Sequence, residues 1–370
     1  MARAMGIIAF EGDNVKIEGI SNHRPISSVS FLGRYRLIDF PLSNYTNSDI
    51  SLIHVYVKEK PRSVFEHVGT GRQYNINSKH GKLRVMYGEE EYSSTLYNTD
   101  INAYLQNEMY IVENDFDHVI IAPSHFIYLQ NFKEVLNKHE KSGVDVTVLY
   151  TETNEADQRF HGAHALLMDD TGRIREFITN RGQQADRKIS VECYVMKKSL
   201  FLDLCHQANA LSSIYWFKNI LAEQVYNLVM VGYPIQGTVL GIFDLQSFYR
   251  ANLSLIDEAH ADLFNEKWPV YTRTNDSVPA YYGEASEVKD ALVANGARVC
   301  GKVKNCVIGR NVEIEKGAEV SDSIILPYAK IAADVKITGC VIDKHAEIIN
   351  QKEIRGLKDQ PIYINRRDKL

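Results

Sequence analysis

Short apolar runs recur through the first 150 residues and are separated by more polar segments. Valine and isoleucine dominate these runs, and few polar residues interrupt them. Continuous runs of this length are typical of parallel strands that are buried on both faces of a sheet. The predicted strands are Ala4–Phe10, Ser51–Val57, Val119–Ala122 and Val144–Tyr150.

Segments with the helical spacing of apolar residues lie between these runs. The clearest is Phe132–Ser142, because Asn131 is a typical N-cap, Glu134 follows three residues later, and Gly143 is a typical stop. Strands and helices in alternation predict a doubly wound, Rossmann-like α/β domain with a mostly parallel sheet. Further predicted elements are the helices Arg62–His67, Thr99–Asn114 and Ile214–Val231 and the strand Val191–Met196.

The pattern changes after about residue 285, where isoleucine or valine recurs every six residues. Ile308, Ile325 and Ile342 each start a set of three or two such positions, and they are 17 residues apart. Three six-residue faces per coil predict a left-handed parallel β-helix. Cys306, Ser323 and Cys340 share one phase of this repeat, so they are expected to stack inside it as small core residues. Glycines are expected at its corners: Gly296, Gly301, Gly309, Gly317 and Gly339.

These patterns divide the chain into two domains. Residues 1–263 are expected to form the α/β domain, and residues 285–370 the β-helix. Residues 264–284 contain Trp268, Pro269 and several tyrosines, and we expect a linker that presses against one or both domains.

Composition narrows the functional classes. The 370 residues carry a net charge of −5, which argues against nucleic acid or a membrane surface as the main partner. The 5 cysteines form no C-x-x-C pair, as expected for a reduced protein without a zinc site. The N-terminal apolar run is too short for a signal peptide, and no run approaches about 18 residues, so a cytoplasmic protein is expected.

One stretch points to a family. Gly33–Asn44 reads GRYRLIDFPLSN, with Arg34 and Arg36 beside an apolar segment, and composition alone favours solvated strand ends for these arginines. Together with the residues from Arg24 on, it resembles the N-terminal signature of the glucose-1-phosphate adenylyltransferase (ADP-glucose pyrophosphorylase) family, roughly KPAVPFGGKYRIIDFALSN. The resemblance implies a nucleotidyltransferase fold and the formation of ADP-glucose from ATP and glucose 1-phosphate.

The metal-binding positions that this resemblance implies have lost their acids. The family's G-D-H reads Pro123-Ser124-His125 here, and its W-x-D-V-G-T falls on Val239–Asp244, which puts Gly241 at the aspartate. A hard divalent cation prefers carboxylate oxygens, for which a serine hydroxyl is a weak substitute. We therefore expect no catalytic residue and no metal site in this chain, and Mg²⁺ only in a catalytic partner.

The implied phosphate positions have changed as well. Ala9–Lys16 keeps one glycine of the family's triphosphate loop and adds Glu11 and Asp13, whose charges would repel phosphate. The family's F-V-E-K-P and S-M-G-I-Y place Asn180 at a lysine and Glu192 at a glycine. The resemblance therefore implies only a vestigial substrate-binding site, formed by Tyr97, Gln106, Asn180 and Ser190.

Other stretches keep the family's pattern. His67–Asn75 resembles H-I-G-x-G-x-x-W-D, and the β-helix matches throughout. A chain that keeps fold-determining positions and loses catalytic ones resembles the GlgD-type regulatory subunit of the bacterial enzyme. This implies a non-catalytic or weakly active companion of a catalytic subunit in glycogen synthesis, in a hetero-oligomer that we expect to be a tetramer.

Two other interpretations stay open. The chain is an active sugar nucleotidyltransferase if other acids replace the lost ligands, and Asp100, Asp115, Asp117 and Asp244 are candidates near strand ends. It is a β-helix acyltransferase if His345, in the last coil, is catalytic; this is the weakest interpretation because such enzymes usually place the histidine between long coils.

An anion site is the last expectation. Arg24, Arg34, Arg36 and Arg72 fall in segments that lie near substrate or regulator sites in the family. They are predicted to bind a phosphorylated metabolite as effector. The alternative, ion pairs with some of the 47 acidic residues, is equally compatible with the sequence.

Overall fold

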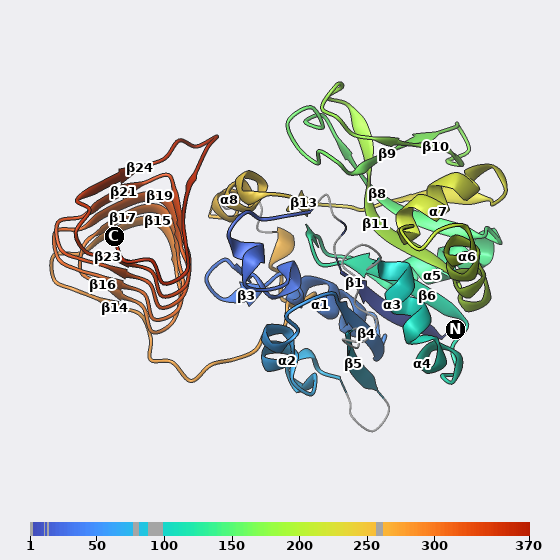
Figure 1. The fold of residues 1–370 in the computed structure, drawn as a ribbon, viewed down its shortest axis with the longest axis horizontal. Coiled ribbons are helices and arrows are strands. Elements are labelled where there is room, and N and C mark those ends of the chain that lie inside the picture. Colours follow the sequence, from blue (N-terminus) through green and yellow to red (C-terminus); the bar gives the residue numbers. More distant parts are fainter. Residues whose placement is uncertain (1–2, 11, 13–14, 77–80, 88–98, 257–261) are drawn as a thin grey trace. The chain divides into compact units, whose positions relative to one another are not determined.

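The computed structural model describes residues 3–10, 12, 15–76, 81–87, 99–256 and 262–370. The chain forms two compact units (Figure 1). Unit 1 comprises Met1–Val15, Ile38–Gly241 and Glu266–Tyr271, and unit 2 comprises Lys16–Leu37, Ile242–Asn265 and Thr272–Leu370.

Unit 1 is built on a mixed sheet whose parallel part has the order β6-β1-β4-β5. These strands are the apolar runs of the sequence, and their side chains are buried on both faces, as in Ile7 and Ile121. Their carboxyl ends therefore meet at one edge of the sheet. The parallel strands are β1 Ala4–Ala9, β4 Leu52–Val57, β5 Lys82–Tyr87 and β6 His118–Pro123.

The sheet continues in antiparallel fashion beyond β6. β11 (Arg187–Lys197) pairs antiparallel with β6, β8 and β9. Outside it, β12 pairs parallel with β8, and β10 pairs antiparallel with β9. The bounds are β8 Val146–Thr153, β9 His164–Met168, β10 Ile174–Thr179 and β12 Met230–Pro234.

Helices pack their apolar faces against this sheet. Tyr104 and Phe201, from α3 and α6, share one core with the strand residues Met5 and Val119. α5 is as predicted, because the Asn131 side chain accepts a hydrogen bond from the Lys133 amide and Gly143 ends the helix at φ 64°. The helices are α1 Asp39–Asn47, α2 Arg62–Val68, α3 Asp100–Gln106, α4 Glu108–Val112, α5 Phe132–Ser142, α6 Lys198–Leu211 and α7 Phe217–Glu223.

Two predicted helices are wrong in extent. Thr99–Asn114 is broken at Asn107, whose side chain donates to the Ala103 carbonyl at 2.9 Å and whose backbone leaves the helical region. Ile214–Val231 becomes α7, a 3₁₀ turn at Gln224–Tyr226, and β12. Its apolar spacing runs on through Met230 and Val231, but those residues belong to a strand.

Unit 2 contains a parallel β-helix, whose stacked coils are drawn in orange to red in Figure 1. Its registers repeat the sequence period, since Val303 lies beside Val320 and Val320 beside Ile337. The predicted fold class, an α/β domain followed by a left-handed parallel β-helix, is confirmed. One face holds β14 Tyr281–Tyr282, β16 Arg298–Val299, β18 Glu313–Ile314, β20 Lys330–Ile331 and β23 Glu347–Ile348. The other strands are β15 Glu287–Val293, β17 Lys302–Ile308, β19 Glu319–Ile325, β21 Lys336–Thr338, β22 Cys340–Ile342, β24 Glu353–Arg355 and β25 Ile362–Ile364.

The expected interior column is present. Cys306 pairs in register with Ser323, and the Cys340 amide donates to the Ser323 hydroxyl at 3.1 Å. All three side chains are fully buried. At the corner of Gly317 the backbone has φ 82°, and a Cβ there would lie 2.0 Å from an oxygen of Asp334, so glycine is required.

Two segments from earlier in the chain complete unit 2. Residues 16–37 contain the hairpin of β2 (Ser30–Phe31) and β3 (Tyr35–Arg36), with 3₁₀ turns at Ile20–Asn22 and Ile26–Ser28. Residues 242–265 contain α8 (Leu245–Ser254), which the Asp244 and Ser247 side chains cap. The segments hold together because the Leu32 amide donates to the Asn252 side chain at 2.9 Å.

The compact units therefore differ from the predicted domains 1–263 and 285–370. Residues 16–37 and 242–265, predicted in the α/β domain, pack with the β-helix. Gly33 illustrates the packing, because with φ 69° a Cβ there would lie 2.8 Å from the Ile308 carbonyl of the β-helix. Within the predicted linker, residues 266–271 pack on unit 1, where the Trp268 indole donates to Asn44 at 3.1 Å.

Candidate functional site

The two positions that should carry metal-binding acids lie together. Ser124 directly follows β6, and the two-stranded ladder of β7 (Phe126–Ile127) and β13 (Leu240–Gly241) sets Gly241 opposite Phe126. The pairing places both positions at the carboxyl edge of the parallel strands, where open α/β sheets bind ligands. Ser124 is fully buried and Gly241 has no side chain. This pair of residues does not fit a divalent cation.

The candidate replacement acids are not gathered there. Asp115 and Asp117 precede β6 and lie at its amino end, where Asp115 pairs with Arg3 at 2.5 Å. Their predicted place near the ligand-binding strand ends is wrong. Asp244 belongs to unit 2, where it caps α8. Within the described ranges, no group of three or more His, Cys, Asp or Glu residues is arranged to hold a metal ion.

Asp100 is the candidate acid that does line the crevice at the carboxyl edge. It begins α3 and accepts hydrogen bonds from the amides of Ile101 at 2.8 Å and Phe217 at 2.9 Å. Burial raises its pKa to about 7, against the opposing effect of these hydrogen bonds. A single oxygen, Oδ1, thus accepts from the start of α3 and from the start of α7.

A second acid in this crevice is Glu192, and its partners define what we call the Glu192 cluster: Glu192, Lys218 and His125. The Lys218 ammonium donates to one Glu192 oxygen at 3.2 Å, and His125 Nε2 lies 3.8 Å from the other oxygen. Burial alone would raise the pKa of Glu192, but Lys218, His125 and His164 hold it below its ordinary value. Burial lowers the pKa of His125 to about 4, so the cluster is a buried carboxylate–ammonium pair beside a neutral imidazole.

Aromatic side chains close the crevice around this cluster. Trp216 packs edge-on against Phe10, with ring centroids 5.8 Å apart. The described residues leave a cavity of about 30 Å³ between the ends of β1 and β6, room for a water molecule and not for a nucleotide. Glu11 and Asp13 of the predicted triphosphate loop lie outside the described residues.

Of the predicted vestigial substrate residues, Asn180 and Ser190 make local hydrogen bonds within the chain. The Asn180 side chain is buried and donates to the carbonyls of Ala156, Arg159 and Phe160, so it holds its own loop. Ser190 accepts from the Glu192 amide at 3.2 Å. Gln106 is exposed at the far end of α3 from Asp100, and Tyr97 lies outside the described residues.

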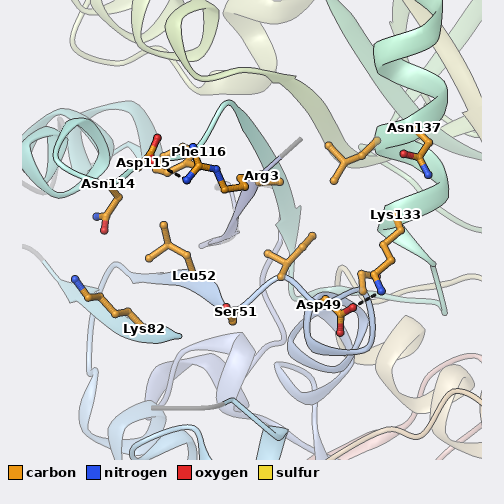
Figure 2. Close-up of a pocket in the computed structure, with 14 residues that line it drawn as sticks. Arg3, Asp49, Ser51, Leu52, Lys82, Asn114, Asp115, Phe116, Lys133 and Asn137 are labelled. Carbon is orange, nitrogen blue, oxygen red and sulfur yellow. Dashed lines mark hydrogen bonds and ion pairs between the residues drawn. The ribbon is translucent and has the colours of Figure 1, made fainter. Parts of the chain in front are cut away.

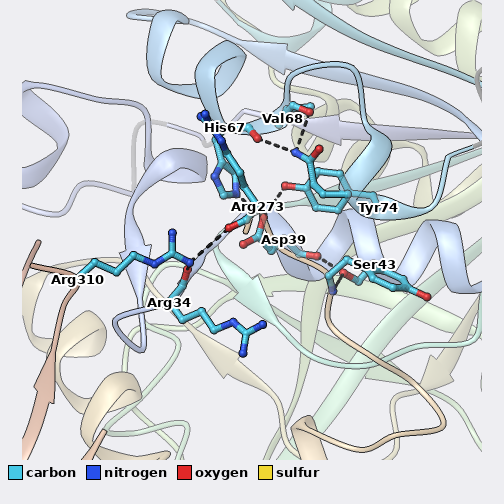
Figure 3. A network of polar contacts seen from close by, with 10 residues as sticks. Arg34, Asp39, Ser43, His67, Val68, Tyr74, Arg273 and Arg310 are labelled. Carbon is cyan, nitrogen blue, oxygen red and sulfur yellow. Dashed lines mark hydrogen bonds and ion pairs between the residues drawn. The ribbon is translucent and has the colours of Figure 1, made fainter. Parts of the chain in front are cut away.

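The two retained motifs meet in a buried network (Figure 3). Asp39, from the first motif, accepts hydrogen bonds from His67 Nε2 and the Tyr74 hydroxyl, both at 2.6 Å and both from the second motif. Ser43 and Asn44, the last residues of the first motif, lie inside α1 and are buried. These contacts give the retained residues a structural role that is independent of substrate.

Cations gather in unit 2, in what we call the Lys344 cluster: Arg24, Arg36, Asp343, Lys344 and Arg366. Arg24 is buried and pairs with Asp343, which also accepts from the Tyr363 hydroxyl at 2.7 Å. Burial lowers the pKa of Lys344 to about 7, and Arg24, Arg36 and Arg366 add to this effect while Asp343 opposes it. Nη1 of Arg24 and Nε of Arg366 are buried without a hydrogen-bond partner among the described residues.

The other predicted anion-site arginines are not among the charges that act on Lys344. Arg34 is exposed, stands 5.6 Å from the centre of the Tyr35 ring, and its carbonyl accepts from Arg310 at 3.4 Å. Arg72 is exposed in unit 1. Lys344, Arg366 and Lys218 were not predicted, because their charge becomes informative only when their neighbours are known.

A larger cavity, of about 490 Å³, lies at the amino ends of the parallel strands (Figure 2). It is lined by both charge signs, and the contacts are internal: Arg3 pairs with Asp115, and Lys133 pairs with Asp49. It lies at the edge of the sheet opposite to the Glu192 cluster.

Comparison with known proteins agrees with this architecture. The family model described as "Nucleotidyl transferase" matches residues 6–227, and the model "GlmU-like, C-terminal hexapeptide" matches residues 277–360. The first match spans more than half of the chain and contains the Glu192 cluster. The second covers most of the β-helix. No helix in the described part of the chain is long and apolar enough to cross a membrane.

Curated relatives align with most of the chain. A protein of Clostridium kluyveri named glucose-1-phosphate adenylyltransferase is 29% identical over 307 residues, 81% of this chain and 79% of its own length. Proteins of the same name from Clostridioides difficile and Fervidobacterium nodosum are 27% identical over 306 residues and 26% over 355 residues. These alignments cover 81% and 94% of this chain, and 79% and 84% of the relatives.

Proposed function

We propose that this chain, which belongs to the nucleotidyl transferase family, is a non-catalytic or weakly active regulatory subunit of a glucose-1-phosphate adenylyltransferase. Its partner is a catalytic homologue that makes ADP-glucose and diphosphate from ATP and glucose 1-phosphate for glycogen synthesis in the cytoplasm. The two chains form a hetero-oligomer, a tetramer in the simplest case, because homologous folds can replace one another at a shared interface.

One observation carries the proposal. Ser124 and Gly241 stand at the positions of the acids that the resemblance implies: Ser124 directly follows β6, and the β7–β13 ladder sets Gly241 opposite Phe126, two residues further on. Phosphoryl and nucleotidyl transfer depend on metal ions that neutralise the developing charge. A serine and a glycine supply no anionic ligand, so the chain retains the fold without the groups that the reaction needs.

The alternative is an active sugar nucleotidyltransferase with relocated metal ligands. Of the candidate acids, Asp100 is in the crevice, but two backbone amides already bind its Oδ1 and its pKa is about 7. A half-protonated acid that faces a 30 Å³ cavity, beside a second carboxylate already paired with Lys218, is a poor magnesium ligand. We therefore favour the regulatory role.

The Lys344 cluster supports an effector site as part of that role. Arg24, Arg36 and Arg366 all disfavour the charged form of Lys344, Asp343 alone opposes them, and two buried N–H groups have no partner among the described residues. Buried donors of this kind cost free energy unless an acceptor binds them. A phosphorylated metabolite supplies charge and oxygen acceptors, so we assign the predicted effector to Arg24 and Arg36 of this cluster, with Lys344 and Arg366 added.

The test is an adenylyltransferase assay of the purified chain, alone and together with a catalytic homologue. Alone, we expect ADP-glucose formation at least about 10³-fold slower than by the homologue, because a lost metal ligand removes several kcal/mol of transition-state stabilisation. Together, we expect one co-eluting complex whose affinity for substrate or effector changes about 5- to 150-fold, the effect of a coupling free energy of about 1–3 kcal/mol.

Two results would contradict the proposal. One is a turnover number of the isolated chain within tenfold of the homologue's, in a preparation free of that enzyme. The other is separate elution of the two chains at micromolar concentration, or saturation curves that superimpose, because a partner that binds all states equally shifts none of them.

A further inference from the structure

The backbone at Glu192 is unusual for a residue with a side chain. Its φ is 53°, in the left-handed region that glycine favours, and it sits in a bulge where the β11–β8 register shifts between Ser190 and Cys193. A left-handed conformation is unfavourable for a residue with a Cβ, so it persists only where the surrounding contacts hold it. The aligned family motif has glycine at this position, so the local backbone suits glycine and the glutamate side chain is an addition to it.

The added side chain points its charge inward. Glu192 is 9% exposed, and its carboxylate meets the Lys218 ammonium at 3.2 Å, with the Lys218 side chain 16% exposed. Burying a carboxylate is costly unless a cation and hydrogen bonds compensate it. The ion pair thus has the chemistry of an anion bound to a lysine, with the anion supplied by the chain itself.

The pair lies at the carboxyl ends of β1 and β6, the edge at which open α/β sheets bind ligands. Glu192 and Lys218 both line the 30 Å³ cavity between β1 and β6, and Asp100 lies on its wall. A phosphate group could reach Lys218 only by displacing the Glu192 carboxylate and would then lie beside two acids. Repulsion between the negative phosphate and neighbouring carboxylates is strong in a buried crevice, because little water screens the charges.

We propose that Glu192 is a built-in substitute for the acidic group of a ligand: it neutralises Lys218, closes the crevice and keeps phosphate-bearing molecules out. This inference rests on the proposed function, because a crevice that is permanently occupied by its own side chain serves a subunit that does not turn over substrate. The loss of catalysis is then twofold, since the metal ligands are missing and the phosphate position is taken.

The substitution Glu192→Gly tests this directly, because glycine suits the φ of 53° and leaves Lys218 without its carboxylate. Inorganic phosphate is titrated into each protein and binding is measured by calorimetry. E192G should bind phosphate at this crevice at least tenfold more tightly than the wild type does. The double variant E192G/K218M keeps the opened crevice without the cation and should lose that event. Any binding to the cations of unit 2 remains the same in all three proteins.

A second variant keeps the inference testable if E192G does not fold. Glu192→Gln removes the charge and keeps the volume, so it should gain phosphate binding more weakly than E192G. If neither E192G nor E192Q binds phosphate more tightly than E192G/K218M, Glu192 is not a substitute ligand. The inference also fails if Lys218→Met weakens phosphate binding by the wild type, because Lys218 would then already contact external phosphate. Neither result depends on turnover or on a partner, so failure here leaves the proposed function to its own assay.

Discussion

The Glu192 cluster in unit 1 and the Lys344 cluster in unit 2 are both groups of buried or half-buried charges, but their charge balance differs. In the first, one lysine faces one carboxylate, and the neighbouring histidine is neutral because burial lowers its pKa to about 4. In the second, Arg24 pairs with Asp343, and three arginines (Arg24, Arg36 and Arg366) act on Lys344 against that single carboxylate. In the Glu192 cluster the positive and negative charges balance, whereas the Lys344 cluster carries an excess of positive charge.

Under the proposed function, this difference corresponds to two consequences of losing catalysis. A phosphate position that no longer serves a reaction can be closed by an acidic side chain from the same chain, as we propose for Glu192. A position that still serves regulation must keep its cations uncompensated, at a cost in stability that bound ligand removes. The lowered pKa of Lys344 and the lowered pKa of Glu192 are the electrostatic signs of these two states.

The largest expected effect is the loss of the cation from the balanced cluster. Lys218→Met leaves the Glu192 carboxylate buried without its partner, which should lower the free energy of unfolding by about 3–5 kcal/mol at pH 7. The loss should shrink toward pH 5, because Glu192 can then become protonated in the variant. Urea unfolding at both pH values measures this, with the exposed Lys141→Met as the matched control. A loss below about 1 kcal/mol would mean that the pair is solvated.

The same chemical change in the other cluster should have the opposite sign. Lys344→Met removes a cation that Arg24, Arg36 and Arg366 repel, so the free energy of unfolding should rise by about 1–2 kcal/mol at low salt. Burial of the ammonium is the larger cause, so added salt should reduce only the part of the gain that comes from relieved repulsion. Lys358→Met, at an exposed position of the same unit, serves as the control. A destabilised K344M would show that Lys344 forms a favourable contact and that the charge excess is not real.

How far these clusters could be predicted depends on the distance along the chain over which their contacts form. The β-helix follows from the sequence because each coil repeats its neighbour after 17 residues, as the stack of Val303, Val320 and Ile337 shows. The parallel strands follow from their continuous apolar runs. Ile214–Val231 was predicted wrongly because apolar spacing cannot tell the end of a helix from the start of a strand such as β12.

The candidate site was predictable only in what it lacks. Ser124 and Gly241 could be located by motif, and the β7–β13 ladder brings them together. The Glu192–Lys218 pair could not be found, since it joins residues 26 positions apart through a bulge in β11 and the start of α7. The Lys344 cluster was half predicted: Arg24 and Arg36 came from a motif, but Lys344 and Arg366 join them only because residues 16–37 pack with the β-helix.

The smallest and most diagnostic effect is the pH dependence of anion binding. The pKa of Lys344 is about 7 in the folded chain, below the ordinary 10.5 of lysine, because of burial and the three arginines. An anion binds the protonated form better and so raises this pKa. Affinity should therefore be nearly constant below pH 7 and should fall as pH rises above it, by at most tenfold per pH unit, since one proton is taken up on binding.

Sulfate is the suitable probe, because its charge stays constant between pH 7 and pH 9 whereas that of phosphate does not. Two other titratable groups near Lys344 do not change protonation between pH 7 and pH 9. The pKa of His345 is lowered from 6.5, and that of Tyr363 is raised above its ordinary 10.0. We expect the sulfate affinity of the wild type to fall about tenfold from pH 7 to pH 9, and that of Lys344→Met to stay flat and low. Calorimetry in buffers of different ionisation enthalpy should show the matching proton uptake above pH 7 in the wild type alone. Equal pH profiles for the two proteins would mean that Lys344 does not face the anion, and the effector would then have to be sought outside this cluster.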